Sequence, residues 1–420
     1  MASPFRSAAF RRLWFSTVVA SAGQGIERTL TAWIALELGA DAFAIGLTFA
    51  VRMVPSLLFG IAAGTLADHV DRPRQLGAVA LAAALLMAGF GGWLAISTGA
   101  VWHVILFSFF AGCVMVFDTP ARQALVLDTV TNDAAQRALA LHALAGRFSQ
   151  ALGALVAGVL IAQIGVPGSY LITTLIYVAV ALLIGTLQVA QEHRRAGERP
   201  QFLPALASSL RMIVDLPVVR TLIIVGLICE IFAFSHLSAV PLFAQNVLAA
   251  GPEGLGTLNA ALSIGGAIAV ALLSLLPERI ARQPLLGAVY LLYGLAIVGF
   301  GFSRDLVFAA LMLLITGFCA AAFDVLQQTL IQLAVPPAQR GRAVGLWVLS
   351  IGSAPIGHLE MGGLAALLGV PSALVINGSL TFVAAALLWL RAPAYRWARR
   401  GPVPLTAAPL NMRPKPRKKP

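Results

Sequence analysis

Four acidic residues interrupt long apolar stretches of this sequence: Glu27, Asp118, Glu230 and Asp324. A carboxylate inside such a stretch is costly, so it is expected to pair with a cation, to face a cavity or to serve function. A carboxylate without a cationic partner in an apolar environment is a candidate proton carrier near neutral pH. These residue types therefore point to ion or proton binding within the apolar part of the chain.

Basic partners are available for two of the four acids. Arg28 follows Glu27 directly, and Arg122 lies one helical turn after Asp118, which places both on one face of a helix. Arg147 offers a second partner for Asp118. We expect Asp118 to serve either in a structural ion pair with Arg122 or Arg147, or in a transport role.

Glu230 and Asp324 have no basic neighbour in the sequence. Two interpretations stay open for them, proton coupling or cargo contact on one side and hydrogen-bonded structural roles on the other. Glu360 is a further candidate for a proton path, with packing against the flanking glycines as its alternative. His358 and Glu360 are two residues apart, so a helix directs them to different faces and no metal site is expected from this pair.

The elements that must position these residues are membrane-spanning helices. Hydrophobic residues make up 59% of the chain and charged residues 11%, far from the composition of soluble domains. Continuous apolar runs of about 20 residues match a bilayer-spanning helix, whereas a barrel needs shorter alternating segments. We predict an all-α membrane protein with twelve spans: 12–38, 43–67, 76–98, 101–126, 138–163, 168–190, 219–248, 255–277, 284–303, 306–333, 342–367 and 371–391.

The chain is duplicated. The segment from Gly64 to Val79 is echoed without a gap by Ser274 to Val289, and Gly165-Val-Pro recurs as Gly369-Val-Pro. Parallel repeats of this kind build two bundles with the substrate site between them. We predict two pseudo-symmetric six-helix bundles with a linker between them and a basic tail: 1–190, 191–217, 218–391 and 392–420.

Arginine and lysine are segregated to alternate connections and to both termini, which predicts that both termini are cytoplasmic. The net charge of +12 therefore reflects basic residues on the cytoplasmic side of the membrane, and no nucleic-acid partner is expected. The tail is interpreted as a solvated disordered segment, with contact to anionic lipid head groups as the alternative.

The loop from Gly64 to Arg74, Gly-Thr-Leu-Ala-Asp-His-Val-Asp-Arg-Pro-Arg, resembles the loop 2-3 motif of the major facilitator superfamily. Other segments resemble the bacterial exporters that include enterobactin-type siderophore exporters and macrolide efflux proteins: Phe10-Arg-Arg-Leu-Trp14, Arg52-Met-Val-Pro55, Phe117-Asp-Thr-Pro-Ala-Arg-Gln-Ala124 and Gly341-Arg-Ala-Val-Gly-Leu-Trp347. The resemblance implies the major facilitator fold, with the helices that carry the four acids lining a central cavity.

The same resemblance implies a cytoplasmic gate at this loop. Asp68 is expected to hold the outward-open state by contacting the other half, with Gly64 allowing close approach. Asp71 belongs to the motif, and Arg72 and Arg74 are expected to pair with acids or lipid phosphates, or to act as simple inside-positive anchors.

Together these features predict a secondary transporter in the bacterial inner membrane that exports an amphipathic small molecule by proton antiport and alternating access. An uptake transporter, a lysophospholipid flippase and a non-transporting sensor are the alternatives. The sequence has no Walker A, Gly-x-Ser-x-Gly or His-Glu-x-x-His motif, so we expect no enzyme and no cofactor. We expect a monomer whose partners are its cargo, protons and the lipid bilayer. The sign of the cargo's charge stays open, because the acids favour a cation while Arg28, Arg52 and Arg147 suit an anion.

Overall fold

The computed structural model describes residues 3–97, 99–131, 133–187, 212–277, 280–336 and 339–391. Helices make up nearly all of these residues, and no strand occurs among them. The predicted tail, 392–420, and the predicted linker up to residue 211 lie outside the described residues.

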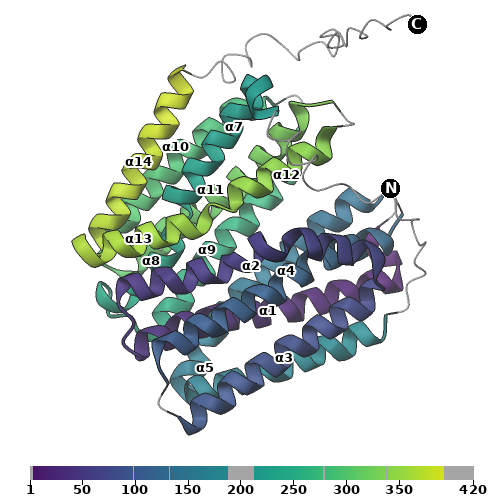
Figure 1. Cartoon of the computed structure of the whole chain (residues 1–420), viewed down its shortest axis with the longest axis vertical. Coiled ribbons are helices and arrows are strands. Elements are labelled where there is room, and N and C mark those ends of the chain that lie inside the picture. The colour runs from purple at the N-terminus through teal and green to yellow at the C-terminus, as the bar shows by residue number, and fades with distance from the viewer. Residues whose placement is uncertain are drawn as a thin grey trace, which may run out of the picture.

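Helix bounds follow the predicted spans closely. The first half holds η1 (Pro4–Arg6), α1 (Ala8–Glu37), α2 (Ala42–His69), α3 (Arg72–Ile96), α4 (Val101–Asp128) and α5 (Ala135–Gly185). The second half holds α7 (Pro217–Ile228), η2 (Cys229–Ala233), α8 (His236–Asn246), α9 (Gly251–Ser274), α10 (Arg282–Gly301), α11 (Leu306–Leu333), α12 (Arg340–Ile351), α13 (Ala354–Leu368) and α14 (Val370–Arg391). Figure 1 shows the two halves as neighbouring helical layers, the first in purple and blue and the second in teal to yellow.

Within the described ranges, nine helical segments are long and apolar enough to cross a membrane. One of them, Ala135–Gly185, spans 51 residues, which is about twice the length that a bilayer requires. It divides at Gly165, where the backbone leaves the helical region. With this division, α1 and the pair α12 and α13 complete the predicted twelve spans.

Two spans are interrupted where continuous helices were predicted. In the span predicted at 219–248, a π-helical turn at Cys229–Ala233 separates α7 from α8. In the span predicted at 342–367, Gly352 and Ser353 separate α12 from α13. Both breaks are local changes in hydrogen bonding, which leave the apolar character of the span unchanged.

The duplication is visible in the backbone. Gly165 has φ 70° and ψ 176°, and its counterpart Gly369 has φ 82° and ψ 154°. A positive φ is readily adopted only by glycine, so both halves use glycine to turn from their fifth span into their sixth. The proline two residues later suits the start of the following helix.

The two halves meet where α2 packs on α13 and α5 packs on α9. Glycines permit this approach: a Cβ on Gly46 would lie 2.5 Å from the carbonyl oxygen of His358, and one on Gly158 would lie 2.7 Å from the Cα of Glu253. These contacts lie near the ends at which α2 and α9 begin. Figure 1 shows the halves converging where α2 lies close to α8 and α13.

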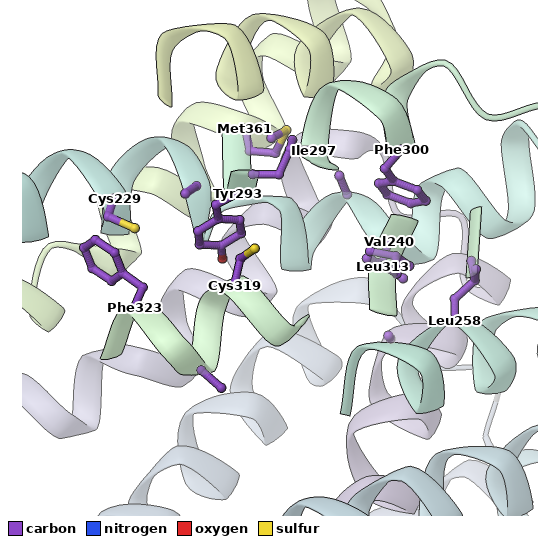
Figure 2. Close-up of a cluster of buried hydrophobic side chains, with 14 of the residues drawn as sticks. Cys229, Val240, Leu258, Tyr293, Ile297, Phe300, Leu313, Cys319, Phe323 and Met361 are labelled. Carbon is purple, nitrogen blue, oxygen red and sulfur yellow. The ribbon is translucent and has the colours of Figure 1, made fainter. Parts of the chain in front are cut away.

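The main apolar core continues through both halves. In the second half, Cys229, Tyr293, Cys319 and Phe323 come together from η2, α10 and α11, as Figure 2 shows. Cys229 and Cys319 are free and buried. They pack as small apolar side chains. Glu230 and Asp324 directly follow Cys229 and Phe323 in the sequence, so this cluster adjoins the two acids.

Candidate functional site

Glu27 lies in α1 and is held by Arg52 of α2. Arg52 donates from Nη1 to Oε1 and from Nη2 to Oε2 of Glu27, both at 2.7 Å, and the Glu27 side chain is only 2% exposed. Thr31 donates a further hydrogen bond to Oε1 at 3.0 Å. A bidentate pair with this support satisfies a buried carboxylate well. Arg28, the neighbour in sequence, points elsewhere because successive helical residues are rotated by about 100°.

Asp118 lies in α4 and pairs with Arg122. Arg122 donates from Nη2 to Oδ1 at 2.6 Å and from Nε to Oδ2 at 2.8 Å. Its Nη1 also reaches Ser16 Oγ of α1 at 3.4 Å. The sequence left open an ion pair with Arg122 or with Arg147. The structure shows the ion pair with Arg122, and the contact of Arg122 with Ser16 links α4 to α1.

Glu230 and Asp324 form no ion pair with any residue that the structure describes. Glu230 lies in the π-helical turn and is 7% exposed. Asp324 lies in α11 and interacts electrostatically with both Glu230 and Arg147 of α5. Figure 2 shows Cys229 and Phe323, which directly precede the two acids, close together. The acids of the second half therefore share one region.

Arg147 reaches from the first half to the second. A Cβ on Gly266 of α9 would lie 2.6 Å from Nη1 of Arg147, so the guanidinium lies against the α9 backbone. Nearby, Asn259 of α9 donates to Thr29 Oγ1 of α1 at 3.3 Å. The boundary between the halves thus carries polar and charged groups, and Arg147 and Asp324 interact electrostatically across it.

Glu360 of α13 belongs to a separate polar cluster. Asn377 Nδ2 of α14 donates to Glu360 Oε2 at 2.8 Å and to Ser235 Oγ at 3.1 Å. His358 instead packs its ring 5.5 Å from that of Phe49 of α2. The two residues therefore have different neighbours, and no cluster of three metal-ligating side chains occurs within the described ranges.

The loop 2-3 motif makes local contacts in this structure. Asp71 caps α3, because its Oδ1 accepts from the Arg74 backbone N–H at 3.0 Å. Arg72 donates to the Ala67 carbonyl oxygen at 3.0 Å and forms an ion pair with Asp128 at the end of α4. Arg74 itself is exposed.

In this conformation a Cβ on Gly64 would meet no described atom within 4 Å, so the close approach expected at Gly64 stays a prediction. The Asp68 side chain lies outside the described residues, so its gate role stays a prediction.

Sequence reasoning missed three partners: Arg52, Asp128 and Asn377. Each lies on a different helix from the acid or loop that it contacts. Of these three, only Arg52 could have been recognised from the sequence, because a single cation inside an apolar span is expected to pair with an acid.

Solved structures share the fold of this chain. The nucleoside transporter NupG matches with a TM-score of 0.77 at 12% identity, covering 91% of this chain and 99% of that chain. A POT peptide transporter in complex with alafosfalin matches with a TM-score of 0.73 at 13% identity, covering 94% and 96%. These likenesses show the major facilitator fold, as predicted.

The family follows from the sequence. The chain belongs to the transmembrane secretion effector family of this superfamily, whose sequence model matches residues 1–412. The staphyloferrin A transporter of Staphylococcus aureus is 23% identical over 359 residues, covering 83% of this chain and 87% of that protein. The multidrug efflux pump Tap of Mycobacterium tuberculosis is 26% identical over 408 residues, covering 91% and 93%.

Proposed function

We propose that this protein exports an amphipathic small molecule across the bacterial inner membrane by proton antiport. The family description, a secretion effector, and the relative described as an efflux pump support the outward direction. Proton coupling is supported by Glu230 and Asp324, which lie in the second half without an ion pair to any described residue. A carboxylate in that setting can bind and release a proton as its surroundings change.

The observation that carries the proposal is the position of Asp324. Asp324 interacts electrostatically with Arg147 of the other half and with Glu230 of its own half, so its charge affects the attraction between the two halves. Protonation of Asp324 would remove its attraction to Arg147 across the boundary and its repulsion from an ionised Glu230. The electrostatic attraction between the halves therefore depends on whether Asp324 is protonated. This is the property that a coupling residue needs.

Alternating access requires two bodies that rock about this boundary. We assign these bodies to the two bundles at 1–190 and 218–391, and the gate of the opposite conformation to Asp68 of the loop 2-3 motif. The basic connections support a cytoplasmic location for both termini, and we propose that the transporter works as a monomer in the bilayer. On this topology the glycine-lined contacts at Gly46 and Gly158 close the periplasmic side.

Proteoliposomes with an imposed pH gradient test the proposal. Wild-type protein should move a fluorescent amphiphile against its gradient, and a protonophore should abolish that movement. Glu230→Gln and Asp324→Asn should each reduce gradient-driven transport roughly tenfold or more, because an amide cannot carry the proton. Asp41→Asn is the matched control, since asparagine also caps a helix and Asp41 caps α2.

Full gradient-driven transport in both Glu230→Gln and Asp324→Asn would contradict proton coupling through these acids. Direction is read from vesicle orientation: an exporter fills everted vesicles, whereas an uptake transporter fills right-side-out ones. Movement of a lysophospholipid between leaflets would assign the flippase alternative, and binding without any movement would assign the sensor.

A further inference from the structure

The charges in the first half do not cancel. Arg52 is engaged with Glu27 and Arg122 with Asp118 through bidentate pairs. Arg28 of α1 and Arg147 of α5 also lie inside predicted membrane spans, and neither forms an ion pair with a described residue. Glu27 and Asp118, the acids of this half that favoured a cationic cargo, are thus already neutralised, whereas Arg28 and Arg147 are not paired with a described carboxylate.

Arg28 has an exposed side chain although it lies well inside α1. Among the described residues, its one side-chain hydrogen-bonding contact is from Nη2 to the Sδ of Met115 in α4, at 3.7 Å. It interacts electrostatically with the like-charged Arg52 and Arg147 and with Glu27, but both carboxylate oxygens of Glu27 already accept hydrogen bonds from Arg52. A guanidinium within a membrane span requires an anion or water, and a thioether is only a weak acceptor.

Arg147, the second of these two arginines, lies at the boundary between the halves. Its guanidinium lies against the backbone of α9 at Gly266, and Asp324 interacts with it electrostatically without forming an ion pair. Arg28 and Arg147 thus lie on α1 and α5, which pack together, and they interact electrostatically with each other. Arg28 also contacts α4 and Arg147 contacts α9, and neither is paired with a carboxylate of the described residues.

We infer that the cargo carries an anionic group, such as a carboxylate, and that Arg28 and Arg147 bind it. Guanidinium groups present paired N–H donors that match a carboxylate. An amphipathic anion would supply the missing counter-charge at this point and leave its apolar part for the helix walls. This inference rests on the proposed transport function, but it is independent of which ion drives the transport.

Equilibrium binding to the purified full chain in detergent tests the inference. The probes are dansyl-phenylalanine and its methyl ester, which share a fluorophore and an apolar side chain but differ by one negative charge. Wild-type protein should bind the acid roughly tenfold or more tightly than the ester, because charge-assisted hydrogen bonds are lost with the ester. Arg28→Gln and Arg147→Gln should each lose most of this preference while keeping the affinity for the ester.

Two kinds of control accompany these variants. Arg28→Lys and Arg147→Lys keep the charge and should retain much of the preference, and Arg304→Gln changes an exposed arginine in the turn before α11 and should behave as wild type. Equal affinity of wild-type protein for acid and ester would overturn the inference, as would a preference that survives in both glutamine variants. Failure of the proposed function has a different signature, namely selective binding without gradient-driven movement in proteoliposomes.

Discussion

In the first half of the chain, Glu27 and Asp118 each accept two hydrogen bonds from an arginine, whereas Glu230 and Asp324 of the second half form no ion pair with a described residue. The halves are nevertheless repeats, down to the glycine turns at Gly165 and Gly369. Asp118 and Asp324 occupy equivalent places, but the residue one turn later is Arg122 in the first half and Gln328 in the second. Duplication thus preserves the architecture while a single neighbouring residue changes the chemistry of an acid.

The largest effect that we expect comes from breaking a pair in the first half. Arg52→Met leaves Glu27 buried without its cation, which costs about 3 to 5 kcal/mol. The purified variant should unfold at a markedly lower temperature in a thermal scan. The double variant Glu27→Gln with Arg52→Met removes both charges and should recover most of the loss. An equal loss in the double variant would show that packing, rather than the charge, requires Arg52.

The next effect comes from giving the second half the pairing of the first. Gln328→Arg places a guanidinium one turn after Asp324, where Arg122 stands relative to Asp118. An adjacent cation favours the ionised carboxylate, so proton-driven transport in proteoliposomes should fall roughly tenfold or more. Gln328→Met is the control for the lost amide. Unchanged transport by Gln328→Arg would mean that Asp324 does not need to exchange a proton.

The smallest effect concerns the echoed loops that begin α3 and α10. Asp71 caps α3, while its counterpart Ala281 leaves α10 without a side-chain cap. Asp71→Ala should therefore lower the free energy of unfolding by about 0.5 to 2 kcal/mol, and Ala281→Asp should raise it by a similar amount. Denaturant titration of the purified protein measures both shifts. A lower stability with Asp71→Ala together with a higher stability with Ala281→Asp would show that the two loops differ in helix capping. A stability unaffected by Ala281→Asp would contradict this.

Much of the fold was predictable because membrane spans are dictated by local composition. Runs of apolar residues, basic connections and the repeated loop indicated the twelve spans and the two halves, and the predicted 306–333 coincides with α11. The interruptions at Cys229–Ala233 and at Gly352 were not predictable in this way. Neither break changes the apolar pattern, and each depends on how neighbouring helices accommodate the backbone.

The candidate site was predictable only in part. Acids within apolar spans stand out in a sequence, and so does a one-turn partner such as Arg122. The partner of Glu27 could not be chosen, because Arg28 is adjacent in sequence while Arg52 lies on another helix and is adjacent in space. Pairings between helices depend on rotation about each helix axis, which composition does not specify.

The π-helical turn at Cys229–Ala233, closed by the bond from the Phe234 N–H to the Cys229 carbonyl oxygen, has a consequence for length variation within the family. A turn of this kind accommodates one residue more than an α-helical turn. Deleting one residue there would restore a regular α-helical turn, so that α7 and α8 keep their faces while Glu230, which lies in the turn, points in a different direction. A chain of this family that lacks the extra residue is therefore expected to present its acid from a different position, and an alignment gap at this turn would mark a change in coupling residue.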